Sequence, residues 1–162
     1  MAEPKKRYIL LQDRVGHIQE RSVLSLGSLK STPTQLLKGE LLEALAETDQ
    51  PNDSTRIALS GIDRKTLRLD CHTEDIARLM DKDADLLLAI SSAGLRYQTF
   101  IHRNRLDFGR QILPGSQVLV EVKGVSKKLH GTVWYIGELP PLHGTMFGVE
   151  LFVSKLVYTY FI

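Results

Sequence analysis

The 162-residue sequence contains little cysteine, few aromatic residues and almost no net charge. Its single cysteine, Cys71, excludes an intramolecular disulfide and favours a reducing compartment. Lysine and arginine are scattered along the chain, the formal net charge is +2, and aromatic residues make up 7%. Nucleic-acid-binding proteins show dense basic faces or interleaved aromatics instead, so we expect no nucleic-acid partner.

Long apolar runs are also missing. No run reaches the ~20 apolar residues of a membrane-spanning helix, so we expect no membrane span. The N-terminus is charged and then apolar for only a few residues, which is too short for the core of a signal peptide. The apolar fraction of 43% and the charged fraction of 25% are typical of a soluble globular protein, and we expect a cytoplasmic location.

The motifs of common enzymes and metal sites are absent as well. The histidines are far apart, and neither a CxxC nor an HExxH pattern occurs. Cys71 and His72 are adjacent, so on a strand they would point to opposite faces and could not act on each other. Asp81, Asp83 and Asp85 alternate but lack the glycine and final glutamate of a calcium loop, which favours a solvated turn. We therefore predict no catalytic residue, no metal and no cofactor.

Local patterns in the first two thirds predict several short elements. Thr32 to Gln35 form a helix-start motif, with Pro33 at the first helical position, and leucines then recur at helical spacing. We therefore expect a helix near residues 33–47. A second short helix is predicted over 74–81. Strands are predicted at 8–11, near 23–24, and over 56–59, 66–70, 86–90 and 96–101.

The last third alternates more sharply between apolar and polar residues. The pattern predicts strands over 117–123, 129–136 and 146–152, with a proline-containing loop at 137–144. Many short strands, with turns every 8–12 residues or so, are typical of a small sandwich or barrel. We therefore predict a mainly β fold with one or two helices.

The glycine spacing of this last third resembles the CAP-Gly domain. The resemblance lies in residues 131–137, 138–142, Gly144 and 148–151. It implies a small antiparallel, SH3-like β barrel that binds acidic C-terminal tails ending in an aromatic residue, as on tubulin. The glycines with a structural role would be Gly131, Gly137, Gly144 and Gly148. The last three would allow tight turns with positive φ and a close backbone approach.

The upstream part resembles the N-terminal region of the cylindromatosis (CYLD) deubiquitinase family, at residues 8–12, 86–90 and 100–112. The resemblance covers about residues 8–152. It implies a β-rich extension over 1–110, a truncated CAP-Gly domain over 111–152 and a divergent tail over 153–162. The family's cysteine peptidase domain is separate, and nothing in this chain matches its nucleophile or histidine. We therefore expect a non-catalytic chain.

The sequence departs from the CAP-Gly pattern in two places. The Gly-Lys-Asn-Asp-Gly loop does not follow Leu151, and Met146 occupies the position of the family's groove aromatic. Two explanations for the different ending stay open. Val153-Ser154 can be encoded by codons that resemble a splice donor, so the last residues would be read from an intron. Alternatively, residues 156–162 replace the closing strand, because they are β-branched and aromatic.

The function implied by the resemblance is protein interaction without catalysis. The partners would be acidic tails of the tubulin type or signalling proteins of the ubiquitin pathway, in a cytoskeletal setting. The alternative is a fragment or isoform of a cysteine deubiquitinase for K63-linked or linear chains that lacks the catalytic domain. The basic cluster around 102–105 is either a solvated loop or part of a basic rim, and Trp134 and Phe147 are either barrel core or contact residues. The predicted contact residues are Trp134, Leu142, Met146, Phe147, Arg103, Arg105 and Lys128.

Overall fold

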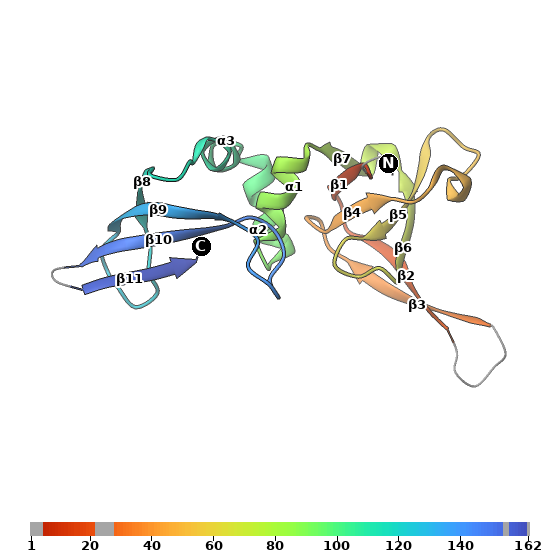
Figure 1. Cartoon of the computed structure of the whole chain (residues 1–162). Helices are drawn as coiled ribbons and strands as arrows, with labels where there is room; N and C mark the ends of the chain where they lie inside the picture. The colour runs from red at the N-terminus through yellow and green to blue at the C-terminus, as the bar shows by residue number, and fades with distance from the viewer. Residues whose placement is uncertain (1–4, 22–27, 154–155, 162) are drawn as a thin grey trace.

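The computed structural model of the chain describes residues 5–21, 28–153 and 156–161. It contains two antiparallel β-sheets with a layer of three α-helices between them (Figure 1). The fold is mainly β, as the alternating patterns predicted. The N-terminal sheet lies at the right of Figure 1, the helices lie at the centre, and the C-terminal sheet lies at the left.

The N-terminal sheet has seven strands in the order β3-β2-β6-β5-β4-β1-β7. In β6, Leu67, Leu69 and Cys71 are buried while the residues between them are at least partly exposed, which is the period-two pattern of a strand. Two 3-10 turns, Glu47–Asp49 and Thr73–Asp75, join strands. The strands are β1 (Arg7–Leu10), β2 (Arg14–Arg21), β3 (Leu29–Leu36), β4 (Leu41–Ala44), β5 (Arg56–Gly61), β6 (Leu67–His72) and β7 (Ile76–Leu79).

The two faces of this sheet have different neighbours. On one face, an apolar core includes Leu10, Leu42 and Leu69. On the other face, Ile9 and Leu41 belong to a second core, which they share with the helices. Because the side chains of a strand alternate between its two faces, consecutive residues such as 9 and 10 serve these two cores. The helices cover the β4-β1-β7 end of the sheet and leave the β3-β2 end open (Figure 1).

The helical layer consists of α1 (Asp81–Leu88), α2 (Ala93–Ile101) and α3 (Asn104–Gln111). The Ser92 hydroxyl caps α2 by accepting a hydrogen bond from the Leu95 amide at 3.4 Å. Arg96 is buried, and its Nε donates to the carbonyl oxygens of Leu87 and Ile90 at the end of α1. Leu86 contacts the core shared with the N-terminal sheet and also the core of the C-terminal sheet. This layer therefore joins the two sheets.

The C-terminal sheet has four strands in the order β11-β10-β9-β8. They are β8 (Gln117–Val120), β9 (Leu129–Gly137), β10 (Met146–Val153) and β11 (Leu156–Phe161). β11 pairs with β10 from Val153↔Leu156 to Gly148↔Phe161, so residues 156–161 do form a strand, as one of the two explanations predicted. The predicted closure into a barrel is wrong for the described residues, because β8 and β11 are not paired and the sheet stays open.

The predicted helix near 33–47 is wrong, because this segment forms β3 and β4 joined by a turn. The turn is fixed by Gly39, which has φ +94° and lies against α2. A Cβ on Gly39 would lie 1.8 Å from the Ala93 carbonyl oxygen. Of the leucines in the predicted helical stripe, Leu41 is buried as the first residue of β4, whereas Leu37 is 50% exposed between the two strands. Tertiary packing thus overrides the helix-start motif.

Three other element predictions are wrong. The segment predicted as a helix over 74–81 is a 3-10 turn followed by β7. The predicted strand over 86–90 is the end of α1 and the turn after it, and the predicted strand over 96–101 belongs to α2. The apolar run at 86–90 is continuous because its helix lies between two cores, and a short run of this kind does not separate a buried strand from a buried helix. The predicted strand near 23–24 lies outside the described residues.

Candidate interaction surface

The outward side of the C-terminal sheet, here called the outer face, is solvent-exposed over three strands. Side chains of β8 alternate strictly, with Val118 and Val120 buried. In β9 and β10, Val133 and Leu151 are likewise buried in the core on the inner side. The register pairs Gln117 with Thr132 and Thr132 with Glu150, which fixes the neighbours across the face. The described residues of the outer face are Gln117, Leu119, His130, Thr132, Trp134, Glu150 and Phe152.

Three large apolar side chains on this face are more than half exposed. Leu119 is 58% exposed, Trp134 is 52% exposed and Phe152 is 59% exposed. They come from three adjacent strands, so they lie on one continuous surface. Single exposed apolar residues are ordinary, whereas a group on one face marks a candidate contact surface.

Polar contacts around Trp134 order this part of the sheet. The ring of Trp134 lies 5.9 Å from the ring of Tyr135, centroid to centroid, at an interplanar angle of 49°. The Tyr135 hydroxyl donates to the Glu138 carbonyl oxygen at 2.6 Å. Next to them, Gln117 Nε2 donates to Thr132 Oγ1 at 2.9 Å. These contacts hold the face in place before any partner binds.

Positive charge lies at the end of the sheet where β8 turns into β9. Lys123, Lys127 and Lys128 are all exposed in this connection. Lys128 forms an ion pair with Glu121, Nζ to Oε1 at 3.1 Å. Exposed lysines attract acidic partners over a range set by ionic strength.

The structure separates the predicted apolar contact residues into two groups. Met146 and Phe147 are buried, and Phe147 belongs to the core of the sheet. Trp134 points outward instead, so its alternative assignment to a barrel core is wrong. Leu142 is exposed in the loop between β9 and β10. Phe147 therefore supports the sheet from its inner side, whereas Trp134 is exposed on the outer face.

Sequence reasoning missed Leu119 and Phe152 as candidate contact residues. Both occupy exposed positions of their strands. For Leu119 the signal was available, because it lies between two valines in a strictly alternating segment.

Among the predicted structural glycines, Gly144 has the clearest role. It has φ +91°, and a Cβ there would lie 2.5 Å from the Asp85 carbonyl oxygen of α1. The next amide, of Thr145, donates to that same oxygen at 2.8 Å. Gly131 lies close to β10, since a Cβ added at this position would lie 2.5 Å from Val149 Cγ1.

The other two predicted glycines lie within strands. Gly137 ends β9, and Gly148 lies in β10 where the register shifts towards Val149. Neither has the positive φ that the resemblance implied, so that part of the prediction is wrong.

The predicted arginines are not on the outer face. Arg103 lies between α2 and α3, and Arg105 lies in α3, both exposed in the helical layer. The guanidinium of Arg103 lies over the Phe100 ring at 5.0 Å. Of the predicted cationic residues, only Lys128 adjoins the C-terminal sheet directly.

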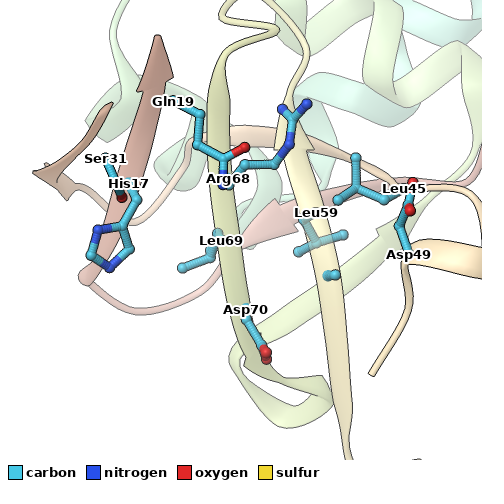
Figure 2. Close-up of a pocket in the computed structure, with 10 residues that line it drawn as sticks. His17, Gln19, Ser31, Leu45, Asp49, Leu59, Arg68, Leu69 and Asp70 are labelled. Atoms are coloured by element: carbon cyan, nitrogen blue, oxygen red, sulfur yellow. The ribbon is translucent and has the colours of Figure 1, made fainter. Parts of the chain in front are cut away.

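The open end of the N-terminal sheet carries a shallow groove of about 560 Å³ with a mixed polar and apolar lining (Figure 2). His17 and Arg68 face each other across β2 and β6. Arg68 donates through one nitrogen to the carbonyl oxygens of Lys65 and Leu67. Charges of both signs line this groove, which therefore favours no single ligand charge. Its lining consists of His17, Gln19, Ser31, Leu45, Asp49, Ala58, Leu59, Arg68, Leu69 and Asp70.

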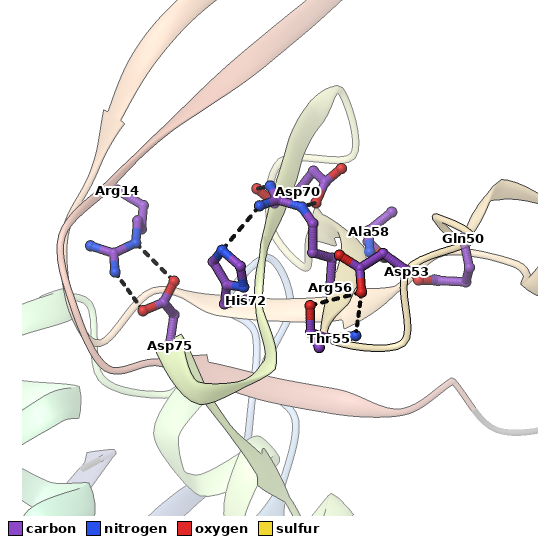
Figure 3. Close-up of polar contacts among 9 residues, drawn as sticks. All are labelled: Arg14, Gln50, Asp53, Thr55, Arg56, Ala58, Asp70, His72 and Asp75. Carbon is purple, nitrogen blue, oxygen red and sulfur yellow. Dashed lines mark hydrogen bonds and ion pairs between the residues drawn. The ribbon is translucent and has the colours of Figure 1, made fainter.

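A set of polar contacts fixes the strand ends beside this groove (Figure 3). Arg56 Nε donates to Asp70 Oδ1 at 2.8 Å, and its Nη1 lies 3.2 Å from His72 Nε2. Arg14 donates two hydrogen bonds to the buried carboxylate of Asp75. That pair holds the pKa of Asp75 below its usual range, although desolvation opposes the shift. Each of these charged groups already has a partner within the fold, which indicates that the set stabilises the sheet rather than binds a ligand.

Cys71 has none of the features of a catalytic thiol. It is buried in the N-terminal core, and burial, reinforced by Asp75 and Asp70, raises the pKa of its thiol to about 11. A thiol with so high a pKa is a poor nucleophile at neutral pH. Within residues 5–21, 28–153 and 156–161, no three potential metal ligands gather at one point.

Comparisons with known proteins point to one group of relatives. No family model matches the chain, and no solved structure matches it. The mouse ubiquitin carboxyl-terminal hydrolase CYLD is 32% identical over 138 residues, which cover 83% of this chain and 12% of the mouse protein. The orangutan (Pongo abelii) CYLD is 34% identical over 99 residues, or 59% of this chain and 10% of that protein. Human CYLD is 37% identical over 81 residues, or 48% and 8%.

The chain thus spans about a tenth of the length of these curated relatives. None of the helices in the described ranges combines the length and apolar character needed to cross a bilayer. The chain is therefore a relative of one segment of the CYLD-type ubiquitin carboxyl-terminal hydrolases.

Proposed function

We propose that this chain is a non-catalytic protein-interaction module of the CAP-Gly type. The observation that carries the proposal is the outer face of the C-terminal sheet, where Leu119, Trp134 and Phe152 are exposed together. Tryptophan is among the residues enriched at binding hot spots. The face is supported from below by a packed core, so a partner would meet a preformed surface.

The size and charge of the outer face suit a peptide. Three strands about 4.8 Å apart, with about six residues of about 3.3 Å each along them, give an area on the order of 300 Å². Stable interfaces between folded proteins bury about 800 Å² on each partner. The lysines of the β8–β9 connection favour an acidic segment. Acidic tails of the tubulin type and acidic segments of ubiquitin-pathway signalling proteins fit this description, and they imply a cytoplasmic, cytoskeleton-associated setting.

Calorimetric titration of the chain with a tubulin-type acidic peptide ending in tyrosine tests this proposal. We expect Leu119→Ser to weaken binding about tenfold, because a ~1.4 kcal/mol loss of apolar contact corresponds to that factor. The matched control is Leu29→Ser in β3, since Leu29 is 61% exposed on the other sheet. Equal affinities for the two variants would contradict the proposal.

A second candidate function is that of a deubiquitinase fragment that retains hydrolase activity. It is suggested by the names of the relatives, which are ubiquitin carboxyl-terminal hydrolases. The buried, high-pKa thiol of Cys71 argues against it. Incubation with K63-linked and linear diubiquitin distinguishes the two, and we expect no cleavage. Cleavage that is lost in Cys71→Ala would establish the second function instead.

A further inference from the structure

The surface where α2 meets α3 carries positive charge that the fold leaves uncompensated. We call this surface the α2–α3 corner, and its residues are Ile101, His102, Arg103, Arg105 and Phe108. Within the described part of the chain, no carboxylate forms an ion pair with either of its two arginines. By contrast, Arg110 in the same helix pairs with Asp83 and Asp107.

The corner is held rigidly by the inner side of α3. Leu106 is buried in the core that the helices share with the N-terminal sheet. A Cβ on Gly109 would lie 3.3 Å from Leu86, so this side of the helix is in close contact with α1. Lys82 donates to the Arg110 carbonyl oxygen at 3.3 Å. Because the inner side is fixed, Arg105 and Phe108, three residues apart, are neighbours on the outer side.

Two exposed apolar side chains accompany the arginines. Ile101 is 49% exposed and Phe108 is 57% exposed. The stacking of Arg103 on the Phe100 ring orders its guanidinium without using its hydrogen-bond donors on a carboxylate. The corner thus combines ordered cations with apolar contact area.

We propose that the α2–α3 corner binds an acidic segment of a protein partner. Carboxylates of that segment pair with Arg103 and Arg105, whose planar guanidinium groups suit bidentate contacts. Apolar side chains of the segment cover Ile101 and Phe108. Membrane-binding clusters use about 4–8 lysines and arginines, more than the two arginines present here, so the charge count favours a protein over an anionic membrane. Arginine and aromatic residues are also enriched at protein interfaces.

This site is independent of the outer face. It lies on the helical layer and shares no residue with β8, β9 or β10. One chain would therefore present two separate surfaces to acidic partners.

An NMR titration of the isotope-labelled chain with a peptide that alternates glutamate and phenylalanine tests the inference. We expect amide shifts at residues 101–108 and about tenfold weaker binding at these residues in Arg103→Glu/Arg105→Glu, because two attractive ion pairs are replaced by repulsion between like charges. Arg78→Glu is the control, since Arg78 is exposed on β7. Phe108→Ser, which keeps the charge, is a second variant and is expected to weaken binding at the same amides.

Several outcomes distinguish this inference from the proposed function. Leu119→Ser is expected to leave the shifts at 101–108 unchanged. The inference is overturned if the double arginine variant binds the peptide as the wild type does at these residues. It is also overturned if the peptide does not bind at the corner but phosphatidylserine vesicles do, because the occupant would then be a membrane.

Discussion

Gly144 is the residue through which the β9–β10 loop contacts α1. Gly144→Ala would force a side chain into a positive-φ position and bring its Cβ within 2.4 Å of the Ala89 nitrogen. We expect a loss of about 3 kcal/mol or more in the free energy of unfolding, because strain and steric overlap act together. Gly115→Ala is a matched control, with φ +93° and no atom within 4 Å of the added Cβ, and is expected to cost about 1 kcal/mol. Equal losses in urea unfolding would contradict this role.

Asp75 gives a residue-scale prediction about pH. Its pKa is lowered in the folded chain, chiefly by the hydrogen bonds from Arg14. A group with a depressed folded pKa stabilises the fold at neutral pH, and this contribution is lost as pH falls from about 4 through the folded value. We expect Asp75→Asn to be less stable at pH 7 and to show a smaller drop in urea midpoint between pH 7 and pH 3. A drop as large as that of the wild type would contradict the assignment.

At the residue scale, the sequence located some candidate side chains in the fold but not others. The sequence pointed to Trp134 as a candidate, and the structure finds it exposed on a strand. It could not tell that Met146 and Phe147 are both buried, because alternation assigns only one of two consecutive strand residues to the core, where Phe147, Val149 and Leu151 lie. It also grouped Arg103 with Trp134, because a linear sequence does not show that Arg103 lies in the helical layer and Trp134 on the C-terminal sheet.

Arg96 acts at the scale of whole elements, because it connects three of them. Its Nε donates to Leu87 and Ile90 at the end of α1, and its Nη2 lies 3.5 Å from Asp63 Oδ2 in the β5–β6 connection. Arg96→Ala would remove the side-chain donor to the Ile90 carbonyl oxygen and one of the donors to Leu87, whose oxygen also accepts from the Ile90 amide, so we expect a loss of about 2–4 kcal/mol in the free energy of unfolding. Arg78→Ala, an exposed control, is expected to stay within ~0.5 kcal/mol of the wild type. Similar urea midpoints for both variants would refute the connection.

At the element scale, strands were predicted well where one face is buried and the other exposed. β6 and β8 show this clearly, and their alternation was readable. α1 was missed because its leucines, Leu86 to Leu88, are consecutive and contact two cores, so they form a short apolar run that also fits a buried strand. The helix predicted near 33–47 failed for the opposite reason. Its local motif was strong, but the chain turns at Gly39 to place both flanking segments in a sheet.

At the scale of the whole molecule, the helical layer should make the two sheets unfold together. Leu59 is fully buried in the N-terminal core, far from the C-terminal sheet in sequence, so Leu59→Ala should cost about 2–5 kcal/mol. Trp134 is the only tryptophan and reports on the C-terminal sheet. We expect Leu59→Ala to lower the urea midpoint seen by tryptophan fluorescence as much as that seen by far-UV circular dichroism. An unchanged fluorescence midpoint would mean that the sheets are independent.

The same tryptophan tests the central claim, that the outer face of the C-terminal sheet is a protein-binding surface. Its emission can be followed while an acidic peptide ending in tyrosine is added at low and high salt. We predict a saturable blue shift as the indole becomes buried, weaker at high salt because the neighbouring lysines are exposed, and weakened by Leu119→Ser but not by Leu29→Ser. Emission that stays constant while calorimetry shows that the peptide binds would contradict the account, because the partner would then occupy another surface.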